Sequence, residues 1–203
     1  MKKTKFFALL LCCFSAFLFS SCLNDDDDTK VGLTAEEVRQ CINSVRGDYD
    51  GDLIYLSQNP TVPNDKTDTL DIDWKVNAAD TTLVIYNFPA KLIAKDLPEG
   101  EVKTALMEAA GTSVKAKVGF YQITPVIGFM LFPMPAVYNV IYGGKAHKVS
   151  AYFKSNGYSF GLHSTTQKVM QMQYVLGGIY LDDNFNTNLL EGKETPFLLV
   201  SKW

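Results

Sequence analysis

Hydrophobic residues recur along the chain with two different spacings. The first spacing is that of a helix. Its apolar positions fall at i, i+3, i+4 and i+7 on one helical face: Val38, Cys41, Ile42 and Val45. Thr34 followed by Glu37 is the pattern of a capping box, and Gly47 suits a C-terminal cap. The sequence therefore predicts a helix over 34–46.

A period of two follows this helix and continues, with one interruption, to the end of the chain. Leu70, Ile72 and Trp74 alternate with charged residues, which is typical of a strand with one wet face. Gly143-Gly144 and Asn156-Gly157 predict hairpin turns, because glycine and asparagine accept positive φ angles. The predicted strands cover 49–55, 70–76, 81–88, 113–123, 126–132, 136–142, 145–154, 158–163, 168–181 and 196–202.

The alternation is interrupted between residues 89 and 111. Pro98 and Glu99 suit a first helical turn, and Gly111 ends the apolar stripe, so a helix is expected here, with room for a shorter one over 90–95. The fold class is mainly β: an antiparallel sheet of about ten strands with an N-terminal helix and a helix inserted after the third strand. A sheet of that size curls into a barrel or into a two-layer sandwich. Residues 31–203 are expected to form a single domain.

The first 21 residues have the features of a lipoprotein signal peptide. Lysines within the first five residues precede an apolar run over 6–19, which is too short for a stable membrane span. The run ends at Phe19-Ser20-Ser21-Cys22, which resembles a bacterial lipoprotein box, where the cysteine becomes the acylated N-terminus. Several acyl chains on Cys22 would hold the protein on a membrane. The alternative is plain secretion with an unmodified Cys22 thiol.

An acidic tract follows the predicted lipidation site. Like charges in one block repel, so residues 22–30 are expected to form a solvated leash. The tract also resembles the surface-export signal of lipoproteins from gut Bacteroides and their relatives; the alternative is a mere spacer. Its members are Asp25, Asp26, Asp27 and Asp28.

A second resemblance lies at the start of the domain. The run Gly47-Asp48-Tyr49-Asp50-Gly51-Asp52-Leu53 is similar to the opening strand of uncharacterised Bacteroides lipoproteins of about this length. Some of those relatives have calycin-like, that is lipocalin-like, barrels, so the resemblance implies a barrel. That family has no assigned activity, and the resemblance therefore implies no functional residues.

Charge and cysteine content narrow the function classes. Lys and Arg number 19 against 22 Asp and Glu, and cleavage removes three lysines and no acid, so the mature charge is -6 and nucleic acid is not an expected partner. Cys12 and Cys13 leave with the signal peptide and Cys22 is acylated. Cys41 alone remains in the domain, on an apolar stripe, where packing is expected and a disulfide is not.

One catalytic motif occurs, and its context argues against it. Gly157-Tyr158-Ser159-Phe160-Gly161 fits the G-x-S-x-G elbow of α/β-hydrolases, but it lies within a predicted strand with no helix after it. The later histidine, His163, follows the serine too closely for the triad order. A chance match is the preferred interpretation, so no catalytic residue is assigned and a serine hydrolase is the least favoured function.

No metal or cofactor is expected from the sequence. His147 and His163 lack the short ligand spacings of zinc sites. The run Asp182-x-Asn184-x-Asn186 begins like an EF-hand loop, but Thr187 and Lys193 stand where glycine and glutamate are needed. A second weak candidate for a cation is the alternating set Asp48, Asp50 and Asp52; a solvated strand face is the preferred interpretation.

Candidate binding residues come from two apolar segments. The uncharged stretch 126–142 predicts two strands joined by a Phe132-Pro133-Met134-Pro135 turn, for which burial is the preferred interpretation. The alternative is that Phe132 and Met134 project at a barrel mouth or partner surface. Met170, Met172 and Tyr174 would fill core gaps or line an adaptable pocket.

These patterns together predict a lipid-anchored protein of the cell envelope, a surface-exposed outer-membrane lipoprotein. The leading function is a non-catalytic binding module for a small apolar, glycan or peptide ligand, or for a partner. The alternative is a structural subunit that docks to an outer-membrane protein.

Overall fold

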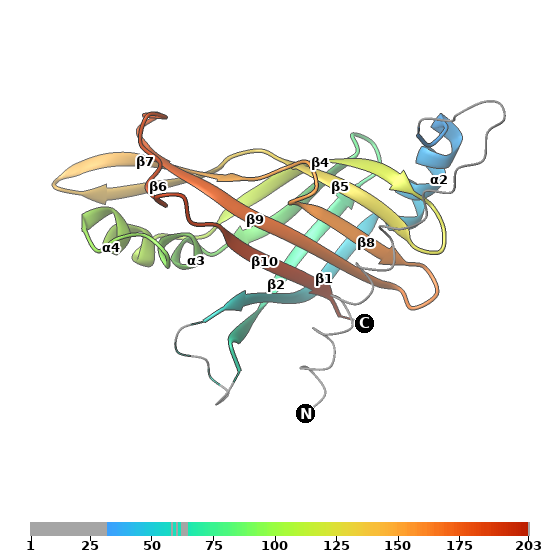
Figure 1. Cartoon of the computed structure of the whole chain (residues 1–203), viewed down its shortest axis with the longest axis horizontal. Helices are drawn as coiled ribbons and strands as arrows, with labels where there is room; N and C mark the ends of the chain where they lie inside the picture. The colour runs from blue at the N-terminus through green and yellow to red at the C-terminus, as the bar shows by residue number, and fades with distance from the viewer. Residues whose placement is uncertain (1–31, 58, 60, 62–64, 203) are drawn as a thin grey trace. The chain divides into compact units, whose positions relative to one another are not determined.

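The computed structural model describes residues 32–57, 59, 61 and 65–202 (Figure 1). The predicted signal peptide and leash, with Cys22 and the four aspartates, lie outside the described residues. Within the described residues, no helix combines the length and the apolar character needed to cross a bilayer.

The leading helix α2 spans Ala35–Val45 and confirms the prediction. The Thr34 hydroxyl accepts a hydrogen bond from the Glu37 backbone N–H, and the Glu37 carboxylate accepts one from the Thr34 backbone N–H, so the capping box is complete. Cys41 and Val45 are buried on its apolar face. The prediction that Gly47 caps the helix is wrong. Arg46 caps the helix, and Gly47 begins β1 with a φ of 147°.

Eight antiparallel strands close into a barrel, which decides between the barrel and the sandwich. Each strand pairs with the next around the barrel in the order β1-β2-β3-β4-β5-β8-β9-β10, and β10 pairs with β1 to complete the ring. Closure leaves these strands no free edge. Their bounds are β1 Gly47–Leu56, β2 Thr67–Asn77, β3 Thr82–Phe88, β4 Thr112–Gln122, β5 Ile127–Pro133, β8 Phe160–Ser164, β9 Val169–Leu181 and β10 Thr195–Ser201.

Two further strands extend the sheet beyond the barrel. β6 (Ala136–Tyr142) pairs with β7 (Lys145–Phe153), and β7 pairs with the second half of β9. Gly143 and Gly144 join β6 to β7 with positive φ angles, as predicted for a hairpin. Asn156 and Gly157 also have positive φ angles, but they do not form the predicted hairpin. β7 and β8 both lie along the same strand, β9, and are therefore two parts of one interrupted strand.

Two helices fill the interruption between β3 and β4, as the sequence predicts. α3 spans Ala90–Ala94, and α4 spans Glu101–Glu108 and contacts β6. Buried Leu92, Ile93 and Leu106 attach these helices to the core. Figure 1 shows α3 and α4 at one end of the barrel, beneath β6 and β7, and α2 at the opposite end.

Side chains from the strands of the barrel point into its interior. The inward positions alternate along each strand, and the largest are aromatic or branched aliphatic residues. Phe88, Phe153 and Phe197 meet edge to face near α3, with ring centroids 5.2–6.4 Å apart. Full burial of each such side chain stabilises the fold by roughly 1.5–3 kcal/mol.

Candidate functional site

Three polar atoms inside the core have no hydrogen-bond partner in the described part of the chain. They are the indole Nε1 of Trp74 on β2, the hydroxyl of Tyr174 on β9 and Nδ1 of His163 on β8. The exposed fraction is 0% for Trp74 and Tyr174 and 6% for His163. A buried polar atom without a partner is unfavourable by about 1–3 kcal/mol, and native proteins contain few of them.

Trp74 lies flat against the wall of the barrel because β1 has a glycine beside it. A Cβ atom on Gly51 would lie 2.2 Å from the Trp74 ring, so no other residue fits there. Tyr49 stacks on the indole with ring centroids 5.6 Å apart and donates its hydroxyl to the Val45 carbonyl. Burial raises the pKa of Tyr49 to about 12. The indole N–H, which only donates, remains without an acceptor.

Tyr174 and Tyr138 are both buried but differ in whether the hydroxyl has a partner. The Tyr138 hydroxyl donates a 3.2 Å hydrogen bond to the Phe88 carbonyl, whereas the Tyr174 hydroxyl has no partner. Burial raises the pKa of both tyrosines well above the ordinary value, so both hydroxyls stay protonated. Phe153 packs edge to face on the Tyr174 ring.

His163 faces inward on β8, opposite Ile127 of β5 and Met170 of β9. Burial lowers its pKa, so the imidazole is neutral near pH 7. A neutral imidazole offers one donor and one acceptor, and its unpartnered Nδ1 suits either role.

The structure brings the predicted Met170, Met172 and Tyr174 together on the inward face of β9. All three are buried. Met170 pairs with His163, and Met172 pairs with Gly161, whose missing side chain leaves room for the Phe129 ring. No Asp, Glu, Lys or Arg is buried among the described residues, so this interior is uncharged.

Phe132 and Met134 are exposed, and the burial interpretation is therefore wrong for both. The exposed fraction of each is 42%. The reason is the topology: β5 and β6 do not pair with each other, so the chain bends at Pro133 and Pro135 instead of folding back into the core. Phe132 thereby lies on the outer face of β5.

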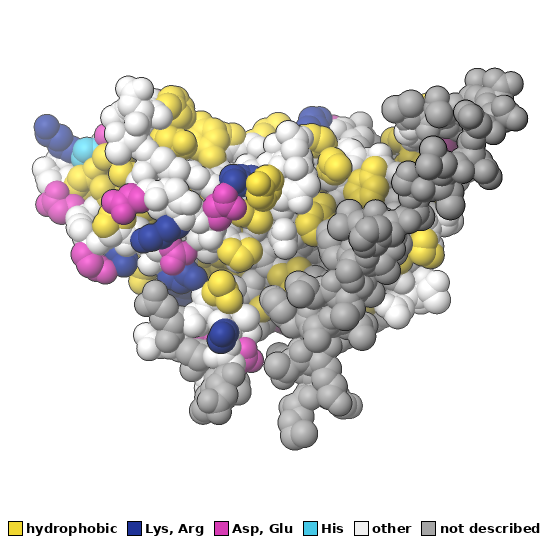
Figure 2. Space-filling model, in the orientation of Figure 1, with side chains coloured by type: hydrophobic (Ala, Val, Ile, Leu, Met, Phe, Trp, Pro, Cys, Tyr) yellow, Lys and Arg dark blue, Asp and Glu magenta, His cyan; other side chains and the backbone are white. Residues whose placement is uncertain are grey.

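Phe132 belongs to a continuous apolar surface, which we call the outer patch. Its ring lies over Gly119 of β4, at 3.0 Å from the position of a Cβ there, and the Tyr121 ring lies in the same way over Gly128 of β5. Because each ring lies over a glycine, both rings lie flat on the wall formed by β4 and β5. The strand register adds three residues to form the set Tyr121, Met130, Phe132, Phe160 and Leu162. Figure 2 shows apolar side chains across the upper and middle part of one face, while charged groups gather toward β6, β7, α3 and α4.

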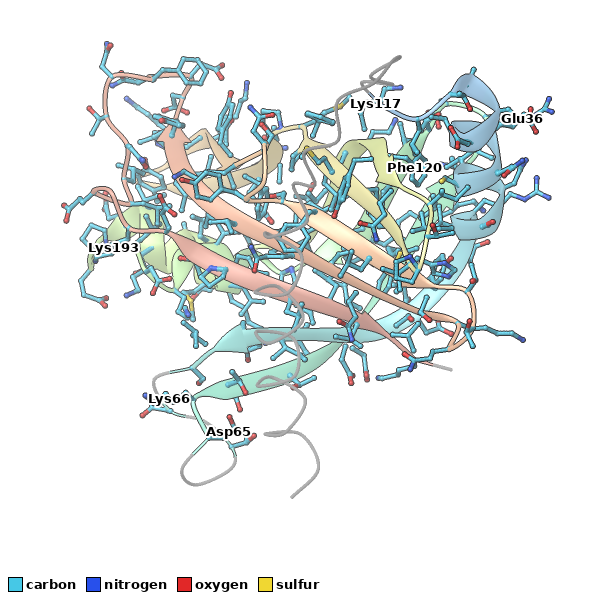
Figure 3. The ribbon with its side chains drawn as sticks, turned by 45° about the vertical axis from the view of Figure 1, so that its right-hand side comes forward. Glu36, Asp65, Lys66, Lys117, Phe120 and Lys193 are labelled. Atoms are coloured by element: carbon cyan, nitrogen blue, oxygen red, sulfur yellow. The ribbon has the colours of Figure 1, made fainter. Side chains whose placement is uncertain are left out.

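Lysines line one side of the outer patch. Lys115 and Lys117 lie on the outer face of β4, and Lys117 is paired with Phe132. The Lys117 ammonium donates to the Asp80 carbonyl at 2.8 Å. Figure 3 shows Lys117 and Phe120, whose side chains lie on opposite faces of β4.

The wall formed by β1 and β2 carries the opposite charge. Asp48, Asp50 and Asp52 all lie on its outer face, as predicted. Two of them form ion pairs with lysines: Lys75 lies 3.1 Å from Asp48, and Lys202 lies 2.9 Å from Asp52. Across residues 32–202, leaving out the undescribed positions, no group of three potential metal ligands comes together.

Ser159 has a structural position in the fold. It is buried where β7 gives way to β8, its hydroxyl donates to the Lys154 carbonyl, and its oxygen accepts from the Val175 backbone N–H at 3.4 Å. These contacts tie the six-residue bulge between the two strands to β9. No strand-to-helix elbow surrounds it, because β8 follows at once.

The EF-hand-like segment is an ordinary turn. Asp182 accepts from the Lys148 backbone N–H at 2.9 Å and lies 2.8 Å from His147 Nδ1. The Asn184 side chain accepts from the Asn186 backbone N–H at 3.1 Å. The hydrogen bond with His147, and after it the one from the Lys148 backbone N–H, lower the pKa of Asp182. Both contacts fasten the turn to β7.

Residues 44–181 match the family model of a domain of unknown function, DUF4840. The chain belongs to this family. No curated protein and no solved structure matches the chain. The DUF4840 match runs from the last turn of α2 to the end of β9, so it stops before β10, which closes the barrel. An uncharacterised family is thereby confirmed, while the Bacteroides lipoprotein type stays a prediction.

Two residues of the candidate site, Trp74 and Tyr121, are not among those that the sequence predicts. The sequence pattern places each of them in a strand but indicates no role in a surface or in a polar interior. The available signal was a glycine in the neighbouring strand, Gly51 for Trp74 and Gly128 for Tyr121, but its use requires the strand register, which the sequence alone does not give.

Proposed function

We propose that the protein is a lipid-anchored, non-catalytic binding module of the cell envelope that docks a protein partner on its outer patch. The observation that carries this proposal is the pair of aromatic rings held flat on the outer wall. Phe132 and Tyr121 remain 42% and 45% exposed although each could pack into a core. Contiguous exposed apolar surface of this kind marks interaction sites in proteins.

The composition of the outer patch supports a protein as the occupant. Tyr, Phe and Met are enriched at the centres of protein interfaces, and this surface consists of them together with Leu162. Lys115 and Lys117 beside it favour a partner with acidic residues around its apolar centre. A second copy of this chain is disfavoured, because the residues of the outer patch include no carboxylate that would pair with these lysines.

The membrane anchor is supported by the sequence at Cys22 and by the leash that follows it. The segment 23–31 reaches at most about 30 Å when extended, which would keep the barrel near the membrane and near an envelope partner. A Cys22→Ala variant should lose its membrane association in cell fractionation. A variant that stays in the membrane fraction contradicts the anchor but leaves the outer patch untouched.

The non-catalytic part of the proposal is supported by Ser159. Its hydroxyl donates to the Lys154 carbonyl and accepts from the Val175 backbone N–H, so its donor is already used by the backbone and not by a general base. A fluorophosphonate probe should therefore fail to label the purified domain. Labelling at Ser159 would overturn this part.

The docking surface is tested by crosslinking in the cells that express the chain. A photoreactive benzoylphenylalanine at residue 132 should give one heavier adduct, and the same group at Asp73, exposed on the outer face of β2, should give none. The partner identified in that adduct should then bind the purified domain, and Phe132→Ser should weaken this binding by about 30-fold. The free energy of unfolding should change by no more than about 0.5 kcal/mol.

Three results would contradict this docking surface. The first is no adduct at residue 132. The second is an equal adduct at Asp73, which would indicate crowding and not docking. The third is an adduct with the mass of two chains, which would make the surface a contact between copies of this protein.

A further inference from the structure

The unpartnered atoms inside the barrel are a separate observation from the outer patch. Trp74 on β2 and Tyr174 on β9 both face the interior, and on one side of the barrel only β1 and β10 lie between their strands. The Tyr174 hydroxyl is not needed for packing, because phenylalanine would occupy nearly the same volume as tyrosine. A buried polar group that is left unpaired in the folded chain requires an explanation, and a bound molecule supplies one.

The interior also restricts the chemistry of such a molecule. Its walls are apolar, and no charged side chain of the described residues is buried there to neutralise a charge. The Trp74 indole donates only, so it requires an oxygen or nitrogen acceptor. Met170 and Met172 lie on the same wall as Tyr174, and methionine changes rotamer readily, which allows the interior to adapt to a guest.

We propose that the barrel interior binds one uncharged, largely apolar small molecule whose carbonyl or hydroxyl oxygen accepts a hydrogen bond from Trp74 Nε1, with a second polar contact to the Tyr174 hydroxyl. His163 Nδ1 offers a third polar contact toward the α2 end of the barrel, where β8 ends. This site does not depend on the outer patch, so either can fail without the other.

The experiment uses prodan, a neutral fluorescent ketone, and the chain's two tryptophans. Trp203, which lies outside the described residues, is replaced by phenylalanine, and Trp74 becomes the only tryptophan. Titration of the full mature chain should show saturable one-to-one binding, a blue shift of prodan emission and quenching of Trp74 emission.

Two matched tyrosine variants locate the molecule. Tyr174→Phe removes a hydroxyl without a partner and should weaken prodan binding about five- to tenfold, as expected for one buried hydrogen bond. Tyr138→Phe removes a hydroxyl that bonds Phe88 and should leave the dissociation constant unchanged. Trp74→Phe should weaken binding by a similar factor, followed by prodan emission alone.

The proposal is overturned if prodan shows no saturable binding, the result expected where ordered water satisfies these atoms. It is also overturned if binding is unchanged in Tyr174→Phe. Loss of binding in Phe132→Ser with full binding in Tyr174→Phe would place prodan on the outer patch and overturn the interior site as well.

Discussion

The buried hydroxyl groups of Tyr138 and Tyr174 should contribute differently to stability. Tyr138→Phe should lower the free energy of unfolding by about 1 kcal/mol, because a buried carbonyl at Phe88 loses its donor. Tyr174→Phe should leave it unchanged or raise it by up to about 1 kcal/mol, because an unpaired buried hydroxyl is removed. Urea unfolding of both variants measures the difference. Equal losses would show that the Tyr174 hydroxyl has a protein partner after all.

Gly51 lies beneath the Trp74 ring, where there is no room for a side chain. A Cβ at Gly51 would lie 2.2 Å from the Trp74 ring and 2.7 Å from the Val200 carbonyl oxygen. Gly51→Ala should therefore destabilise the fold by about 1–3 kcal/mol or more through overpacking. Gly100→Ala, where a Cβ meets nothing within 4 Å, is the control. Thermal unfolding that ranks the two variants alike would contradict the flat placement of Trp74.

The buried imidazole of His163 makes stability depend on pH. Burial lowers its folded pKa below the ordinary 6.5, so in mildly acidic solution the unfolded chain binds a proton that the native chain does not. The free energy of unfolding should fall as the pH drops below about 6.5. His163→Gln should lose less stability than the unmodified chain between pH 7.5 and 5.5 in urea titrations. Identical losses would show that His163 does not carry this dependence.

At the scale of elements, periodicity predicted most of the fold because it is a local property. The helix at 35–45 and its capping box, the insertion after β3 and the alternation of the strands all follow from neighbours in sequence. Pairing partners do not, and both errors of topology come from that. The Asn156-Gly157 segment joins β7 to β8, which both pair with β9, so the hairpin predicted there is wrong. At residues 133–135 the chain passes from β5 to β6, which do not pair with each other.

Ser159 stabilises the bulge between β7 and β8. Ser159→Ala removes the donor to the Lys154 carbonyl and the acceptor for the Val175 N–H, both in a buried position. We expect a loss of about 1–3 kcal/mol in the free energy of unfolding, with prodan binding unchanged. Denaturant unfolding checks it. A variant as stable as the unmodified chain would leave the G-x-S-x-G serine without this structural role.

At the scale of the whole molecule, the sequence predicts which residues share a face better than it predicts their exposure. Met170, Met172 and Tyr174 share one inward face because alternation fixes which residues point together. Phe132 was expected inside because large apolar residues are usually buried. Its exposure results from eight strands closing without β6, a long-range property. The barrel ring thus produces two surfaces, an uncharged interior and an apolar outer wall.

Thiol protection tests most directly whether a partner covers the outer patch in cells. Among the described residues the free cysteine is Cys41, which is buried, so N-ethylmaleimide should react there only with a cysteine introduced on the surface. Lys117→Cys, beside Phe132, should react with N-ethylmaleimide in the purified domain and be protected in intact cells. Asp73→Cys, on the acidic wall, should react equally in both. Equal labelling of Lys117→Cys in cells and in the purified domain would contradict a docked partner.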